Sequence, residues 1–132
     1  IGDVYKTNVF SLCKWIDSYS SHACRERFGL PQNIELIGKA IQQKPPSAEL
    51  RPGQKDSDSL PDYSILDPLL KALIEDKINP EQLIKDGNDP ILIEDIKQLI
   101  KNGEFKRRQA PPLLKVSQQA FGTGWRRPIA SA

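Results

Sequence analysis

Three groups of side chains in this sequence could bind phosphate or another anion. Lys6 is expected in the first turn of a helix, where the backbone N–H groups also attract anions. Ser47 lies in a polar loop, in which its hydroxyl and the backbone amides could donate to a phosphate while Lys44 and Lys55 add positive charge. The third group is the run Lys106–Arg107–Arg108, whose guanidinium groups can form two parallel hydrogen bonds to a phosphate or carboxylate.

Each of these groups also has a plainer interpretation. Lys6 could be a solvated surface lysine, and the loop around Ser47 could be a linker. The chain carries a net charge of +2, but residues 104–132 contain six of its Lys and Arg residues and only one Glu, so its positive charge is concentrated there. With Phe105, Phe121 and Trp125 nearby, this distribution keeps open an alternative function, a helical interaction module with a basic arm that binds nucleic acid.

The sequence gives little support for a metal site or for a catalytic nucleophile. The chain has one histidine, His22, and two cysteines, Cys13 and Cys24, without a CxxC pair, so we expect no metal site and assign no catalytic residue. A disulfide between the two cysteines stays open, although a helix over residues 4–19 favours two reduced thiols. No signal peptide, lipidation motif or long apolar run is present, and we expect a cytoplasmic protein that does not enter a membrane.

Apolar spacing in the first half of the chain predicts helices that hold these groups. Residues 4–19 form an amphipathic pattern, with Asp3 as its expected N-cap and the serines at 18–21 as its end. Residues 33–43 predict a shorter helix capped by Asn33. The proline-rich stretch 44–61 has almost no apolar side chains and predicts a mobile loop, since a loop of this length is usually a lid, a binding loop or a linker.

Residues 62–103 predict further helices joined by tight turns. The first covers 62–76, with Pro68 near its start, and the next two are opened by Asn79–Pro80 and Asp89–Pro90, each a cap followed by proline at the first helical position. Asn102–Gly103 is the expected end of the last helix. Residues 104–132 lose this periodicity and predict a basic extended arm, with Val116 in a possible short strand.

The same residues carry a specific resemblance to a known family. Three stretches match, in order, the C-terminal part of the synthetase domain of glutamine-dependent NAD⁺ synthetases. They are Gly2-Asp3-Val4-Tyr5-Lys6-Thr7-Asn8-Val9, the loop from Lys44-Pro45-Pro46-Ser47 to Ser59-Leu60-Pro61, and Phe105-Lys106-Arg107-Arg108-Gln109-Ala110-Pro111-Pro112 with the later Leu114-Lys115-Val116 and Arg126-Arg127-Pro128-Ile129.

The resemblance implies an ATP-dependent carbon–nitrogen ligase. Enzymes of this family adenylate the nicotinate carboxylate of deamido-NAD⁺ with Mg-ATP, and ammonia then displaces AMP to give NAD⁺. In the glutamine-dependent branch the ammonia comes from glutamine. The resemblance implies Lys6 and Ser47 as ATP-binding residues, Lys106 and Arg107 as deamido-NAD⁺-binding residues, and assembly into a homodimer or a higher homo-oligomer.

The resemblance covers only part of the family's synthetase domain. The Ser-Gly-Gly-x-Asp-Ser pyrophosphate loop of the family is absent from these residues, and the Mg²⁺ ligands are expected upstream. We therefore expect residues 1–132 to be the mainly α-helical C-terminal portion of a Rossmann-like α/β domain, inactive by itself, with its parallel sheet upstream. Within it we expect helices over 1–43 and 62–103, a mobile loop over 44–61 and the basic arm over 104–132.

Overall fold

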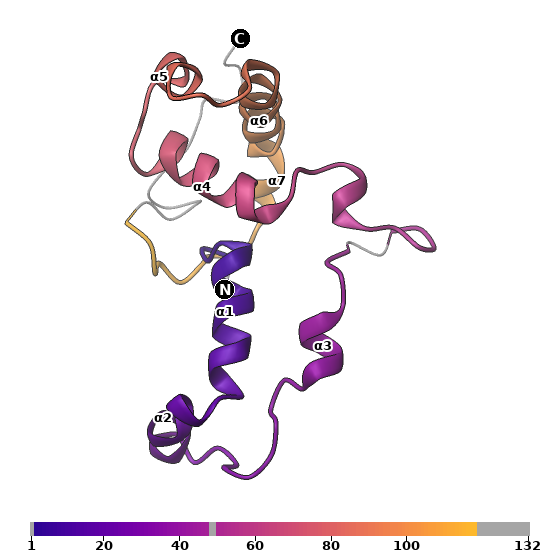
Figure 1. Cartoon of the computed structure of the whole chain (residues 1–132), viewed down its shortest axis with the longest axis vertical. Coiled ribbons are helices and arrows are strands. Elements are labelled where there is room, and N and C mark those ends of the chain that lie inside the picture. Colours follow the sequence, from indigo (N-terminus) through magenta and orange to yellow (C-terminus); the bar gives the residue numbers. More distant parts are fainter. Residues whose placement is uncertain (1, 48–49, 119–132) are drawn as a thin grey trace. The chain divides into compact units, whose positions relative to one another are not determined.

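The computed structural model describes residues 2–47 and 50–118, and every regular element within these ranges is helical (Figure 1). This confirms the expectation of a mainly α chain; the parallel sheet expected upstream stays a prediction. The chain divides into two compact units. Residues 1–5 and 64–132 form one, the terminal unit, and residues 6–63 form the other, the middle unit.

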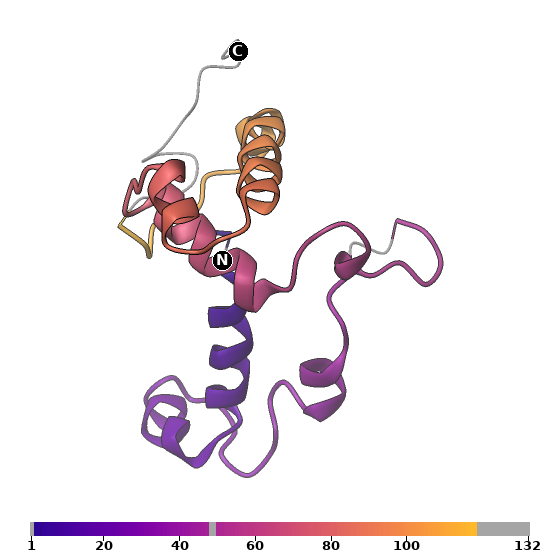
Figure 2. The same ribbon diagram turned by 45° about the horizontal axis from the view of Figure 1, so that its top comes forward.

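The terminal unit is built on three helices that bury one apolar cluster. They are α4 (Tyr63–Ile74), which enters this unit at Ser64, α5 (Pro80–Lys85) and α6 (Pro90–Asn102), seen from two directions in Figures 1 and 2. The predicted helix over 62–76 is thus confirmed. Aliphatic side chains from all three helices are excluded from water and supply most of the folding free energy of this unit. They are Leu66, Leu69, Ile74, Leu83, Ile93, Ile96 and Ile100.

Both predicted cap-and-proline signals are confirmed. The side chain of Asn79 accepts a hydrogen bond from the N–H of Glu81 at 3.0 Å, and Asp89 accepts one from the N–H of Ile91 at 2.9 Å. In each case the proline occupies the first helical position, where its missing N–H costs no hydrogen bond. These local signals therefore fix the starts of α5 and α6.

The prediction of an extended arm from residue 104 is wrong over its first part. Residues Glu104–Gln109 form helix α7, and Gly103 between α6 and α7 has a helical φ of −73° instead of a left-handed terminating conformation. Glu104 near the positive end of this helix and the basic residues in its last turn favour the helical form. Val116 is not in a strand, and residues 119–132 of the predicted arm lie outside the described residues.

The middle unit begins with α1 (Lys6–Ile16), which is shorter than the predicted helix. A 3-10 turn, η1 (Tyr19–Ser21), follows α1 through the serine-rich stretch, and α2 (His22–Arg27) comes directly after it. Asp3 does not occupy the N-cap position predicted for it, because α1 starts only at Lys6 and the Asp3 carboxylate binds the backbone of residues 116 and 117 instead.

The helix predicted over residues 33–43 forms only as α3 (Lys39–Gln43). Asp17 explains the difference, because its carboxylate accepts the N–H groups of Leu36, Ile37 and Gly38 at 2.7, 3.2 and 2.9 Å. Gly38 has a φ of 77°, which favours glycine and ends the irregular segment where α3 begins. Asn33 is therefore not a helix cap.

A buried arginine organises the chain between α2 and α3. Arg25 is only 3% exposed, and its guanidinium donates to the carbonyl oxygens of Ile16, Pro31 and Ile34. Burial of a cation costs free energy unless hydrogen bonds compensate it, and here three carbonyl oxygens accept from the two terminal nitrogens, while Nε is buried without a partner among the described residues. The guanidinium thus fastens the turn after α2 to the end of α1.

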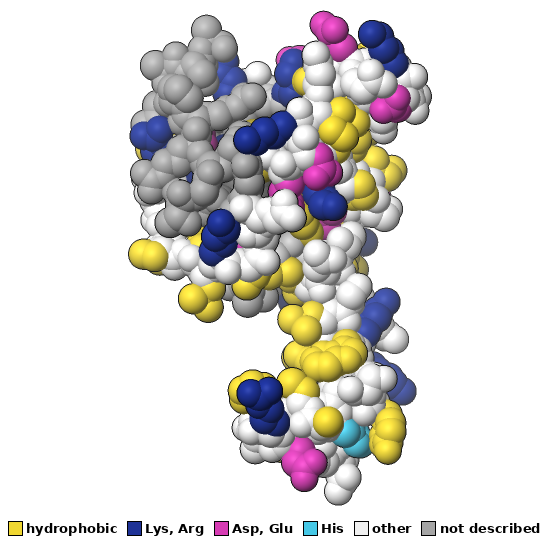
Figure 3. Space-filling model, turned by 90° about the vertical axis from the view of Figure 1, so that its left-hand side faces the viewer, with side chains coloured by type: hydrophobic (Ala, Val, Ile, Leu, Met, Phe, Trp, Pro, Cys, Tyr) yellow, Lys and Arg dark blue, Asp and Glu magenta, His cyan; other side chains and the backbone are white. Residues whose placement is uncertain are grey.

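The apolar side chains of α1 are not buried by the described residues. None of its residues is buried, and Leu12 and Trp15 remain 42% and 40% exposed. Figure 3 shows hydrophobic side chains at the surface in the region of the cyan histidine. Cys13 and Cys24 are free thiols, as expected. The described part of the chain contains no helix that is both long and apolar enough to span a membrane.

The Asp17 carboxylate makes the conformation of residues 36–38 sensitive to acid. Partial burial opposes its ionisation, but the bonds from Gly38, Ile37, Leu36 and Gln42 outweigh burial and hold the pKa of Asp17 below its ordinary 3.8. Because the folded-state pKa is lowered, the stabilisation is complete above the unfolded-state pKa and is lost as pH falls through the folded-state value.

We therefore expect Asp17→Asn in the full-length protein to accelerate amide hydrogen exchange in a peptide covering residues 36–38 at neutral pH. In the unsubstituted protein the protection factors of these amides should be constant above pH 5 and fall below about pH 4. Asp95→Asn, at an exposed position on α6, is the matched control. Equal protection in the Asp17→Asn protein and the control would contradict this assignment.

Candidate functional site

The loop over residues 44–61 is closed at its base by two hydrogen bonds. The N–H of Asp56 donates to the carbonyl oxygen of Pro46 at 2.9 Å, so that the two ends of the segment between them meet. The Asp56 carboxylate in turn accepts the hydroxyl of Tyr63 at 2.6 Å, which ties the base of the loop to the start of α4. Asp56 therefore connects the two ends of the loop through its backbone and connects the loop to α4 through its side chain.

Further hydrogen bonds shape the tip of this loop. The N–H of Leu50 donates to the side-chain oxygen of Gln54 at 3.1 Å, and the N–H of Gln54 donates to the carbonyl of Arg51 at 3.3 Å. Gly53 has a φ of 71°, a conformation in which a side chain would be strained. A short 3-10 turn, η2 (Asp56–Asp58), ends the loop. In the described residues the segment is thus locally ordered by its own polar groups.

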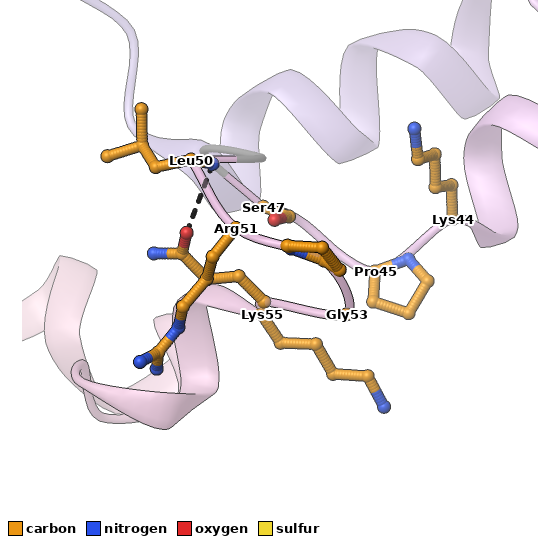
Figure 4. A pocket seen from close by; sticks show the side chains of 9 residues that line it. Lys44, Pro45, Ser47, Leu50, Arg51, Gly53 and Lys55 are labelled. Atoms are coloured by element: carbon orange, nitrogen blue, oxygen red, sulfur yellow. Dashed lines mark hydrogen bonds between the residues drawn. The ribbon is translucent and has the colours of Figure 1, made fainter.

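The loop encloses an open hollow of about 550 Å³ with a cationic lining. Figure 4 shows Lys44, Arg51 and Lys55 extending in different directions around the turn that carries Ser47. The lining contains these three cations and, among the described residues, no acidic side chain. Its members are Lys44, Pro45, Ser47, Leu50, Arg51, Pro52, Gly53, Gln54 and Lys55.

The chemistry that this hollow supports is the binding of a multiply charged anion. Arg51 lies 4.0 Å from Asp58, but both side chains are exposed, so this ion pair holds Arg51 only weakly. The three cationic groups diverge in Figure 4, and a phosphate chain entering the hollow would draw them together by charge. Ser47 and the neighbouring backbone supply hydrogen-bond donors of the kind that phosphate oxygens accept.

Lys6 belongs to the same unit as this loop but does not line the hollow. It is the first residue of α1, and its ammonium lies 5.9 Å from the centre of the Tyr63 ring, within the range of a cation–π contact. Tyr63 therefore contacts Lys6 with its ring and Asp56 with its hydroxyl. From the sequence, Tyr63 was assigned only to the apolar stripe of the predicted helix. The position of its hydroxyl next to a polar loop could have indicated that Tyr63 also binds the loop.

Lys106 and Arg107 line a second hollow, in the terminal unit. It has a volume of about 320 Å³ and is bounded by Gly2, Lys106, Arg107, Ala110 and Leu113. Lys106 is exposed at this position. The structure thus brings together the two residues predicted to bind the second ligand, and it adds Gly2 and Leu113, which the sequence did not single out for this site.

Arg107 is strongly engaged with the protein itself. Its guanidinium donates to the Glu104 carboxylate at 3.0 Å and to the carbonyl oxygen of Ile100 at 2.5 Å, and Glu104 is only 4% exposed. Arg108 donates to the other oxygen of Glu104 at 3.4 Å. A methyl group on Gly103 would lie 2.8 Å from the guanidinium, so glycine leaves the space that Arg107 fills.

This pairing changes the interpretation of the basic run. A nucleic-acid-binding strip needs cations that can exchange counterions for phosphates, whereas Arg107 and Arg108 both share the buried Glu104 carboxylate. Of this run, Lys106 has the exposed position in the second hollow. The described residues thus favour a discrete anion contact at Lys106 over a continuous basic surface.

A metal ion finds no ligand set in the described ranges. No group of three or more His, Cys, Asp or Glu side chains there is arranged to hold one.

Comparison with known proteins identifies what this chain is similar to. The family model described as NAD synthase matches residues 1–110. The whole chain is 46% identical to part of the glutamine-dependent NAD(+) synthetase of Synechocystis sp., and 99% of it is 40% identical to part of that of Thermotoga maritima. It covers 21% of each of these relatives, and thus spans about a fifth of their length.

A solved structure gives the same result. It is the glutamine-dependent NAD⁺ synthetase of Acinetobacter baumannii in complex with ADP, which matches 96% of this chain at 29% identity with a TM-score of 0.51. The chain covers 19% of that protein.

The hydrogen bond from Tyr63 to Asp56 should control how firmly the loop is held. In the full-length protein we expect Tyr63→Phe to increase the rate of tryptic cleavage after Lys55 about fivefold, because a hydrogen bond to a charged group is lost. Tyr19→Phe removes a hydroxyl from a side chain that is 84% exposed and serves as the control. Cleavage rates that match those of the control would show that this bond does not hold the loop.

Proposed function

This chain belongs to the NAD synthase family, and we propose that it is the C-terminal part of the synthetase domain of a glutamine-dependent NAD⁺ synthetase. The proposal rests chiefly on the cationic hollow around Ser47, because its lining suits the phosphate chain of a nucleotide. The homologous structure holds ADP, which supports a nucleotide as a ligand of proteins of this kind.

The proposed reaction is the ATP-dependent amidation of deamido-NAD⁺. A carboxylate oxygen of the nicotinate group attacks the α-phosphorus of ATP, the bond to the β-phosphate oxygen breaks, and pyrophosphate leaves. Ammonia released from glutamine then attacks the acyl carbon of the adenylate, AMP departs, and the carboxamide of NAD⁺ remains. The transition state of the first step carries much negative charge, so positioned cations lower its free energy.

We assign the loop over residues 44–61 to the ATP side of this reaction. Ser47 donates to a phosphate, while Lys44, Arg51 and Lys55 neutralise the triphosphate and the departing pyrophosphate. Closure of such a loop over the nucleotide excludes water, which protects an acyl-adenylate from hydrolysis. Lys6, at the positive end of α1, adds a further contact to the ATP phosphates. No step of this proposal depends on a metal ion held by the described residues.

We assign the second hollow to deamido-NAD⁺. Lys106 contacts an anionic group of the dinucleotide, and Arg107 adds positive charge from beside it while it remains bonded to Glu104. We further propose that the enzyme is a cytoplasmic homodimer or higher homo-oligomer. Residues outside this chain supply the pyrophosphate loop and the Mg²⁺ ligands, so residues 1–132 alone have no synthetase activity.

The products test this reaction. The full-length protein, given deamido-NAD⁺, ATP, Mg²⁺ and ammonia, should form NAD⁺ with AMP and pyrophosphate in equal amounts, and residues 1–132 alone should form none. Chromatography of the nucleotides and a coupled pyrophosphate assay measure both. Formation of ADP and phosphate would contradict the adenylate mechanism, and turnover by the short chain would contradict the division of the active site.

Substitutions of the two lysines should separate the two ligands. We expect Lys6→Ala to raise the KM for ATP about tenfold with little change in the KM for deamido-NAD⁺, and Lys106→Ala to do the reverse, because each removes one charged contact to one ligand. Lys85→Ala, at an exposed position at the end of α5, should change neither. Steady-state kinetics with each substrate varied in turn decides the assignment, and equal effects on both substrates would contradict it.

A further inference from the structure

We propose that Asp3 is a positioning residue for the second hollow, because its carboxylate holds residues 116 and 117, which continue the chain that lines this hollow at Leu113. The inference rests on the proposed function for the identity of the ligand, deamido-NAD⁺. It gives a role to a residue that no earlier step of the mechanism uses.

The contact joins residues that are far apart in the sequence. One carboxylate oxygen of Asp3 accepts the N–H groups of Val116 and Ser117 at 2.8 and 2.7 Å, and the other accepts the hydroxyl of Ser117 at 2.9 Å. Asp3 is only 6% exposed, so these charge-assisted bonds face little competition from water. The carboxylate thereby holds a segment that has no regular secondary structure of its own.

The neighbouring glycine brings the same two segments into close contact. A methyl group placed on Gly2 would lie 3.0 Å from one terminal carbon of Leu113 and 3.2 Å from the other. Gly2 and Leu113 both line the second hollow, together with Lys106, Arg107 and Ala110. The Asp3 contact and the Gly2 contact therefore fix the chain on both sides of residues 114 and 115, and Leu113, at the start of this stretch, lines the hollow.

Asp3 is itself held in place. Tyr5, two residues further on, is hydrogen-bonded to Glu75 just after α4, and burial together with this bond raises the pKa of the Tyr5 hydroxyl far above its ordinary value. Residues 2–5 are thus fastened to the helical core of the terminal unit through Tyr5 and to residues 113–117 through Gly2 and Asp3. Because residues 2–5 are held in place in this way, the Asp3 carboxylate can fix the position of the chain that it binds.

The experiment compares Asp3 variants of the full-length enzyme in steady-state kinetics. We expect Asp3→Ala to raise the KM for deamido-NAD⁺ about tenfold, since it removes all three bonds that hold the chain following Leu113. Asp3→Asn keeps the shape and an accepting oxygen, and should recover most of this loss, leaving a rise of about threefold. The kcat and the KM for ATP should change less than twofold, because the three bonds hold residues 116 and 117 and none of them involves the loop over residues 44–61.

Two controls separate this role from a general loss of stability. Asp95→Ala, at an exposed position on α6, should leave all three constants unchanged. Ser117→Ala removes only one of the three bonds and should raise the KM for deamido-NAD⁺ about twofold without affecting folding, so it tests the inference even if Asp3→Ala does not fold.

The outcomes distinguish the inference from the function on which it rests. If Lys106→Ala raises the KM for deamido-NAD⁺ and the Asp3 and Ser117 variants do not, the role of Asp3 is overturned and the function stands. If Lys106→Ala also leaves this constant unchanged, the assignment of the hollow to deamido-NAD⁺ fails. A parallel fall in kcat and rise in both KM values for Asp3→Asn would make Asp3 a merely structural residue and overturn the inference.

Discussion

Carboxylates that accept backbone N–H groups hold the non-helical parts of this protein in place. Asp17 binds three successive amides before α3, and Asp3 binds two amides beyond α7. A backbone N–H without a helical partner needs an acceptor, and an ionised carboxylate is the strongest that a side chain offers. The cationic groups proposed to bind ligands can therefore lie on irregular chain that is nevertheless fixed in shape.

Acidic residues also shape each of the two hollows, although most of the donors that they bind there are side chains. Around Ser47, the Asp56 backbone and side chain close the loop, and the hollow with its three cations follows from that closure. In the terminal unit, Glu104 binds Arg107 and Arg108, and Asp3 binds the chain after Leu113. The acidic residues of both sites thus bind donors of the protein itself, and the positions of the cationic groups are fixed before a ligand binds.

The parts of the fold that were predictable from the sequence depend on neighbouring residues. Asn79–Pro80 and Asp89–Pro90 contain both the cap and the proline that start a helix, so no distant contact was needed. The irregular conformation of residues 33–38 could not be predicted. Their apolar stripe favours a helix, and the carboxylate that prevents it belongs to Asp17, which lies outside the predicted helix. Helix α7 was predictable in principle, since Glu104 precedes two arginines at the spacing of one helical turn.

For the candidate site, the cationic groups were predictable from residue type, whereas Tyr63, Gly2 and Leu113 were not, because only the folded chain brings them to these groups.

The different engagement of Arg107 and Lys106 follows from the chemistry of their side chains. A guanidinium presents several donors in a rigid plane, and Arg107 uses them on a carboxylate and a carbonyl at once, which locks α7 against the end of α6. An ammonium on a flexible stem gains less from such a fixed arrangement and can follow a ligand that changes during a reaction. The buried Glu104 pairs with both arginines, whereas Lys106, directly before them in the sequence, lines the hollow. The rigid guanidinium groups therefore stabilise the structure, and the flexible ammonium lies where a ligand can bind.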